Sequence, residues 1–255
     1  MPSPVPVRYP SGVTTEYPWG PLANYGLPNP FFYHVDADDF DWSANVSAAW
    51  TKTTSGNGTV AQTAVDGGVA LFTTNSSTPS ASDVASIQRA AAGFTFTAGK
   101  KHFFLIRMLL ADVVNPAFNV GLVQTTATPF TVADGLYFNK ATGSSTNLQL
   151  VSTVSSANTT VAIPTNEYLL TNATFVDLCW SIDRNGVVYG SVGQQLLVGY
   201  QAQSGTGATT PDRCPDVSFT PTLTSATLNL TVAIQSGTAS SKTAQVDFVL
   251  CAKER

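Results

Sequence analysis

The stretch KHFFLIRMLL, residues 101–110, decides the fold class of this chain. It is the clearest of several short apolar, β-branched runs that are separated by polar breaks, and no stretch shows a sustained helical period of apolar residues. Short strands with turn signals roughly every 8–12 residues are typical of a β-sandwich or barrel. The later runs of this kind are 118–123, 135–138, 148–151, 175–182, 187–190 and 196–200.

Alternation along these runs predicts which side chains face the core, because successive residues of a strand point to opposite faces. Near the C-terminus, apolar residues alternate over 228–234 and again over 244–250, which predicts a long terminal hairpin with one buried face. Segment 84–92 fits a strand or a short helix equally well. The predicted core comprises Phe104, Ile106, Met108, Leu136, Phe138, Leu178, Trp180 and Ile182.

The composition is polar but poor in charge. Charged residues make up 11% of the chain, against about 25% in an average soluble domain. A nearly neutral surface rich in Thr, Ser, Asn and Gln favours association with neighbours, although Thr and Ser also have good strand and turn propensities. The net charge of −4 and the lack of a basic stripe argue against nucleic acid. No apolar run reaches the ~20 residues of a membrane helix.

The chain shows no secretory leader, since no basic region precedes an apolar core at its N-terminus. We therefore expect folding in a cytosolic compartment with reduced thiols. The three cysteines are Cys179, Cys214 and Cys251. Cys179 lies within an apolar run, which predicts a small buried hydrophobe.

Residues 1–35 differ from the rest, because they hold more than half of the 15 prolines and many aromatic residues. Proline lacks an N–H, so this segment is not expected to form a helix or a central strand. We predict two parts, an extended N-terminal arm over 1–35 and a β-sandwich domain over 36–255. Aromatic residues favour burial, either on the chain's own sandwich or on a neighbouring subunit. The candidate partner-binding residues of the arm are Tyr9, Tyr17, Trp19, Tyr25, Phe31 and Phe32.

Candidate catalytic and metal-binding residues are few. The acidic segment 36–41 is either a calcium loop or a solvated turn, and it lacks the glycine and distal glutamate of an EF-hand. Asp177 and Asp183 are the best candidates for the paired carboxylates of a glycosidase. His34 and His102 are the only histidines, and no Gly-x-Ser-x-Gly motif accompanies them. We therefore predict no enzymatic activity, no bound metal and no cofactor.

The succession of runs from 101–110 to 148–151, followed by WSID at 180–183, is similar to concanavalin-like or jelly-roll sandwiches, particularly those of tailed-phage virion proteins. DGLYFNK at 134–140 and KTAQVDF at 242–248 resemble phage capsid decoration (head-associated) proteins. The likeness extends over about residues 60–255 and implies an antiparallel β-sandwich that stabilises an icosahedral head.

The resemblance also implies partners and a location. The partners would be the major capsid protein and sister copies in a dimer or trimer. The location would be the capsid exterior of the virion, after synthesis in the host cytoplasm. The alternative is a carbohydrate-binding or receptor-binding domain of a phage tail or fibre protein, because exposed aromatic rings stack on sugars. Candidates for such a platform are Trp19, Trp42, Trp50, Tyr137, Tyr189 and Tyr200.

Overall fold

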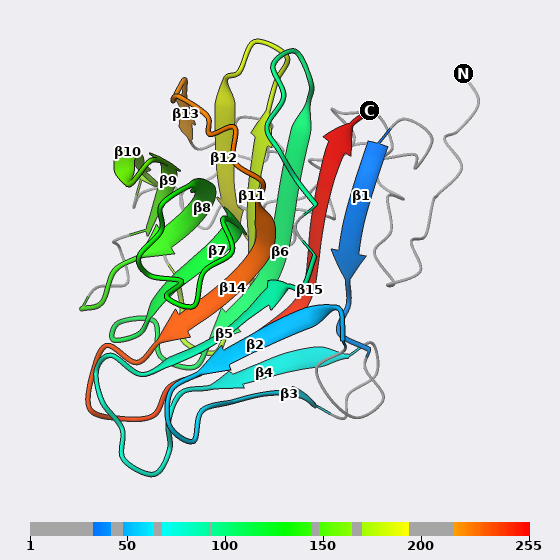
Figure 1. The fold of residues 1–255 in the computed structure, drawn as a ribbon. Coiled ribbons are helices and arrows are strands. Elements are labelled where there is room, and N and C mark those ends of the chain that lie inside the picture. The colour runs from blue at the N-terminus through cyan, green and yellow to red at the C-terminus, as the bar shows by residue number, and fades with distance from the viewer. Residues whose placement is uncertain are drawn as a thin grey trace, which may run out of the picture.

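The computed structural model describes residues 33–41, 48–63, 68–91, 93–143, 148–164, 170–193 and 217–255. Over these residues the chain is all-β, and two antiparallel sheets pack face to face as a sandwich (Figure 1). The predicted fold class is confirmed. The described ranges contain no helix, and accordingly none that is long and apolar enough to cross a membrane.

The eight-stranded sheet is organised around its longest strand, β15. Its strands are β1 (Tyr33–Asp38), β3 (Thr59–Thr63), β4 (Val69–Thr73), β6 (His102–Leu110), β11 (Val176–Ile182), β12 (Val188–Gly193), β13 (Val217–Phe219) and β15 (Thr243–Glu254). The order is β13-β12-β11-β6-β15-β4-β3. β15 pairs with β6 on one side, and on the other side its first residues pair with β4 and its last residues with β1.

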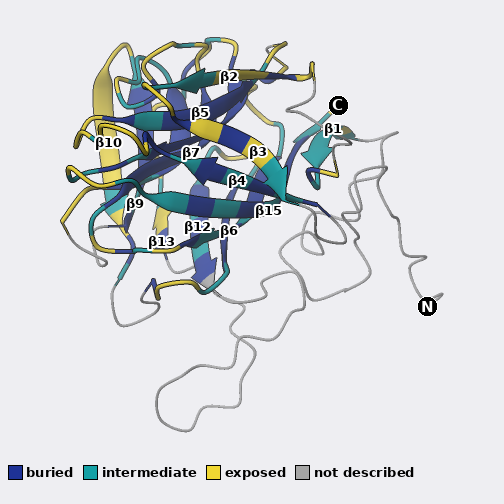
Figure 2. Ribbon diagram, turned by 90° about the horizontal axis from the view of Figure 1, so that it is seen from below, coloured by how far each residue is buried: buried dark blue, intermediate teal, exposed yellow. Residues whose placement is uncertain are grey.

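The seven-stranded sheet covers the other side of the core. Its strands are β2 (Trp50–Thr54), β5 (Val84–Arg89), β7 (Ala117–Val123), β8 (Gly135–Lys140), β9 (Leu148–Val154), β10 (Ala157–Ala162) and β14 (Asn229–Gln235), in the order β10-β9-β8-β7-β14-β5-β2. The ambiguous segment 84–92 thus contains a strand. At one edge, β10 is exposed along most of its length, as Figure 2 shows.

The core between the sheets agrees with the predicted strand facing. All eight residues predicted from alternation are buried in the main apolar cluster. Within it, the Phe104 and Trp180 rings stack with centroids 5.5 Å apart, because these two residues are register partners on β6 and β11.

The predicted terminal hairpin is wrong. β14 pairs with β5 and β7 in the seven-stranded sheet, whereas β15 pairs with β6, β4 and β1 in the eight-stranded sheet. Alternate residues of β14 face the core as predicted. On β15, a bulge between Val246 and Phe248 reverses the facing, so Ala244 and Val246 lie in the core between the sheets, whereas Phe248 and Leu250, predicted for the same face, lie on the opposite one. Alternation indicates which face of a strand is buried, but not which strand is its hydrogen-bonded neighbour. Two strands with this pattern can lie in opposite sheets as readily as side by side in one sheet. Segment 236–242 therefore crosses from one sheet to the other.

Two further boundaries differ from the sequence-based expectation. β1 begins at Tyr33, so the sheet starts inside the segment assigned to the arm. β10 was missed, because the turn that joins it to β9 contains neither glycine nor asparagine. Ser155 and Ser156 occupy that turn with φ of 50° and 67°, a conformation in which glycine or asparagine is the usual signal.

The outer face of the eight-stranded sheet carries a second buried apolar cluster. Cys179 belongs to it, so this residue is a buried hydrophobe as predicted, but not one of the core between the sheets. Cys251 lies in the core, where burial raises the pKa of its thiol. Cys214 lies outside the described residues. The cluster comprises Phe103, Leu105, Cys179, Phe248, Leu250 and Ala252, with Tyr33, Val35 and Ala37 packed against it.

Candidate functional site

The outer face of the seven-stranded sheet is polar. On β7, Phe118, Val120 and Leu122 point into the core, so alternation turns Asn119 to the outer face. The strand register then places a row of side chains beside Asn119. This amide row consists, from β9 to β2, of Gln149, Asn139, Asn119, Ala233, Ser86 and Thr53.

A second row of side chains on the same face runs parallel to the amide row and lies two residues away from it on each strand. It consists of Val151, Tyr137, Gly121, Thr231, Gln88 and Thr51. Neither row contains a charged side chain. Both rows consist mainly of amides, hydroxyls and small residues, with one tyrosine.

Hydrogen bonds hold the amides in fixed orientations. Asn139 Nδ2 donates to Asn119 Oδ1 at 2.7 Å, and Asn119 Nδ2 donates to the Pro129 carbonyl at 2.8 Å. In the second row, Gln88 Nε2 donates to Thr231 Oγ1 at 2.9 Å. The face is therefore an ordered array of hydrogen-bonding groups.

The loop between β7 and β8, residues 124–134, lies over the middle of this face. The Gln124 N–H donates to the Asp134 carbonyl at 2.9 Å and closes the base of the loop. Above the sheet, the Thr126 N–H donates to Gln88 Oε1 at 3.1 Å, and Asn229 Nδ2 donates to Thr125 Oγ1 at 2.6 Å. These contacts bury the central polar side chains.

The amide row stays open at its β8–β9 end. Asn139 and Gln149 are half-buried, and Gln149 forms no side-chain hydrogen bond with any residue that the structure describes. Beyond them lies the exposed β10, which contains Asn158, Thr159 and Thr160. Free amide groups can both donate to and accept from ligand hydroxyls. This end of the row can therefore bind an uncharged, hydroxyl-rich molecule.

The carboxylates singled out in the sequence are not brought together. Asp177 is buried on the outer face of the eight-stranded sheet, whereas Asp183 lies in the β11–β12 turn and accepts from the Asn185 and Val187 N–H groups. The sequence did not reveal which residue pairs with Asp177, because this contact depends on which strands are neighbours. Arg107 lies between Asp177, at 3.4 Å, and Asp247, at 3.3 Å. Asp247 sits at the bulge of β15.

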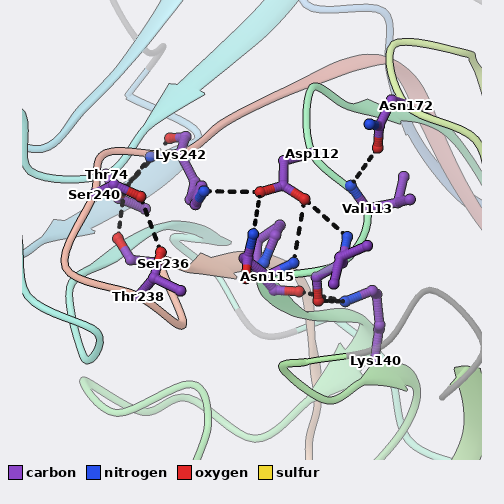
Figure 3. Close-up of polar contacts among 12 residues, drawn as sticks. Thr74, Asp112, Val113, Asn115, Lys140, Asn172, Ser236, Thr238, Ser240 and Lys242 are labelled. Carbon is purple, nitrogen blue, oxygen red and sulfur yellow. Dashed lines mark hydrogen bonds and ion pairs between the residues drawn. The ribbon is translucent and has the colours of Figure 1, made fainter.

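A third polar cluster joins loops at one end of the sandwich (Figure 3). Asp112 accepts from Lys242 Nζ at 2.7 Å and from Asn115 Nδ2 at 2.7 Å. Burial alone would raise the pKa of Asp112, but the hydrogen bonds from Lys242 and Asn115 outweigh it and hold that pKa well below its usual range. The buried Lys140 Nζ donates to three backbone carbonyls, those of Val114, Pro116 and Ala141. With these bonds made inside the protein, the cluster serves to fix the loops.

The histidines and the acidic segment have structural partners. His102 is buried, with its ring nitrogens near the Lys100 and Thr95 carbonyls, and the exposed His34 lies against the Phe94 ring. In segment 36–41, Arg89 pairs with Asp36 at 2.7 Å and with Asp38 at 3.1 Å. Within the described ranges, no group of three or more His, Cys, Asp or Glu side chains could hold a metal ion.

Three of the six aromatic candidates lie within the described residues, and none of these three is fully exposed. Trp50 and Tyr137 are buried, and the half-buried Tyr189 donates to Asp183 Oδ2 at 3.4 Å. Trp19, Trp42 and Tyr200 lie outside the described residues. So do all six partner-binding candidates of the arm: Tyr9, Tyr17, Trp19, Tyr25, Phe31 and Phe32.

Structural comparison shows which known proteins share this fold. Arcelin-5, a lectin-like defence protein from Phaseolus vulgaris, matches 88% of this chain and 100% of its own at 10% identity and a TM-score of 0.56. An endo-1,3-beta-glucanase from Streptomyces sioyaensis matches 89% and 98% at 14% identity, with a TM-score of 0.53. A protein of unknown function from Shewanella oneidensis MR-1 matches 97% and 95% at 13% identity, with a TM-score of 0.56. No family model and no curated protein sequence matches the chain.

These matches give the fold as a concanavalin-like β-sandwich, of the kind found in lectin-like proteins and glucanases. They do not support the resemblance to capsid decoration proteins. They also correct the prediction that the chain is not an enzyme. That prediction was inferred from missing motifs, yet the same fold carries an endo-1,3-beta-glucanase, so the missing motifs do not exclude enzymatic activity.

Proposed function

We propose that the chain binds a neutral carbohydrate through the outer face of the seven-stranded sheet. The observation that carries the proposal is the amide row, an ordered series of uncharged hydrogen-bonding side chains that ends at the half-buried Gln149, whose side chain forms no hydrogen bond with the described residues. Sugar hydroxyls both donate and accept hydrogen bonds, and amides match both functions. The lectin-like neighbour and the glucanase neighbour support this choice over the capsid decoration role.

A soluble β-1,3-glucan oligosaccharide is the first ligand to test, since one neighbour is an endo-1,3-beta-glucanase. Isothermal titration of the intact chain would be compared with Gln149→Ala and Asn139→Ala. Each substitution removes one or two neutral hydrogen bonds, so we expect affinity to fall about three- to tenfold. Gln245→Ala is the matched control, because Gln245 is equally half-buried on the other sheet.

Two results would contradict the proposal. One is the absence of binding to any member of a panel of neutral glycans. The other is binding that Gln149→Ala and Gln245→Ala weaken equally, which would move the site away from the amide row. Reducing ends released from the same oligosaccharide would be measured in parallel, because release would identify a hydrolase and not a binding domain.

A further inference from the structure

Asn229 differs from the other amides of the polar face. The residue is 1% exposed, and its Nδ2 donates to Thr125 Oγ1. Within the described part of the chain, its Oδ1 has no hydrogen-bond partner. Buried polar atoms are nearly always paired, so an orphaned acceptor needs an explanation. This one lies beneath the 124–134 loop, next to the second row.

The loop presents to the sheet one hydroxyl, two backbone carbonyls and a backbone N–H, which occupy hydrogen-bonding groups of the sheet that sugar hydroxyls could otherwise bind. The Thr125 hydroxyl accepts from Asn229, and the Pro129 carbonyl accepts from Asn119. The Gln124 carbonyl and the Thr126 N–H bind the two ends of the Gln88 amide. The loop thus satisfies most of the central amides but leaves Asn229 half satisfied.

Residues 125–128 of the loop are attached to the sheet by polar contacts. None of the side chains of residues 124–128 is buried, whereas Pro129 is buried and Val132 packs on Val123, Tyr137 and Val151. Hydrogen bonds exchange with water at little net cost, and segments with few buried apolar contacts open first. Residues 125–128 can therefore lift while the hydrogen bond between Gln124 and Asp134 and residues 129–134 stay in place.

We propose that residues 125–128 of the 124–134 loop are a built-in occupant of the central face, which a vicinal diol of the ligand's non-reducing terminal sugar displaces; internal residues of a β-1,3-glucan have no free hydroxyls on adjacent carbons. This inference rests on the proposed function. One hydroxyl of the diol takes the place of the Thr125 hydroxyl at Asn229 Nδ2, and its neighbour donates to Asn229 Oδ1. Both groups of the amide are then paired, which the closed loop does not achieve. The loop competes with the ligand, so its closed population lowers the apparent affinity.

Thr125→Val tests this competition, because it keeps the shape of the side chain and removes the hydroxyl that Asn229 binds. The closed state loses one neutral hydrogen bond, and the affinity for the β-1,3-glucan oligosaccharide should rise about two- to tenfold. Thr128→Val is the matched control on the same loop, since Thr128 contacts Thr126 and not the sheet. Combining Thr125→Val with Asn229→Ala should abolish the gain.

Hydrogen exchange gives a second readout in the unaltered chain. The Thr126 N–H is held by Gln88 Oε1 when the loop is closed, so saturating oligosaccharide should accelerate its exchange. Binding that responds to Gln149→Ala, with equal affinities for Thr125→Val and Thr128→Val and unchanged Thr126 exchange, would overturn the inference and leave the proposed function standing. Absence of binding by every form would overturn both.

Discussion

His102 should make the folded protein less stable as the pH falls from about 6.5 to about 4. The side chain is 2% exposed at the start of β6, and the Phe96 ring packs edge-on against it with centroids 5.3 Å apart. Burial disfavours the imidazolium, and Lys253 repels it, whereas the Thr95 and Lys100 carbonyls favour it. Burial dominates and lowers the pKa of His102 from 6.5 to about 4.

The direction of the effect follows from proton binding. In the unfolded chain the imidazole takes up its proton near pH 6.5, but in the folded chain only near pH 4. Between these values the unfolded state binds more protons, so stability falls as the pH falls. A shift of this size corresponds to a loss of about 2 kcal/mol at pH 5 and about 3 kcal/mol at pH 4.

Urea unfolding at several pH values, followed by tryptophan fluorescence, would measure this loss. His102→Gln should remove it, and His34→Gln is the control, because His34 is the other histidine and is exposed. Glu254 does not interfere, since its hydrogen bonds with Arg184 and Lys101 lower its pKa to about 2, below this window. A pH dependence in His102→Gln equal to that of the parent, or an NMR titration of the His102 ring near pH 6.5, would refute the reasoning.

Three further predictions concern the core, the polar face and the ligand. Phe104→Ala and Trp180→Ala should each lower the free energy of unfolding, measured in urea, by about 3–5 kcal/mol. Because the two rings stack, the loss in the double variant should be about 0.5–1.5 kcal/mol smaller than the sum of the two single losses. Strict additivity would contradict the contact. Gly121→Ala should lower the thermal stability of the protein more than Gly143→Ala. Both glycines have positive φ, but only at Gly121 would a Cβ meet backbone, 2.5 Å from the Leu136 carbonyl oxygen. Equal losses of stability would argue against a close approach of β7 and β8. Affinity for a neutral glucan should be unchanged from about 50 mM to about 500 mM NaCl, because neither polar row carries a charge; a steep loss in titrations at high salt would point instead to the ion pairs of Arg107.

The sequence predicted strand facing well where no bulge interrupts a strand, because facing depends on local alternation, but the prediction failed at Phe248 and Leu250, beyond the bulge of β15. Residues such as Phe104 and Trp180 could be assigned to the core from their immediate neighbours alone. Sheet membership could not be predicted in the same way, since β14 and β15 have equivalent patterns and lie in opposite sheets. Strand pairing joins residues far apart in the chain, and nothing in either pattern specifies the partner.

The candidate site was missed for a related reason. Asn119, Asn139 and Gln149 each occupy a polar position within an apolar run, which is the signal of an outward side chain. Only the strand register brings the three into one row. Charged pairs, histidines and aromatic rings stand out in a sequence as candidate site residues, whereas this face consists of amides and hydroxyls that individually resemble ordinary surface residues.

The low charge of the chain also has a second explanation in this structure. From the sequence, a nearly neutral polar surface indicated packing against neighbouring subunits. In the folded chain, uncharged polar side chains form the two rows on one face, where hydrogen bonds to one another and to the 124–134 loop order them. A surface that merely lacks charge needs neither ordered amides nor a buried Asn229 Oδ1 that has no hydrogen-bond partner among the described residues. Those two features favour recognition of a hydroxylated ligand over passive packing.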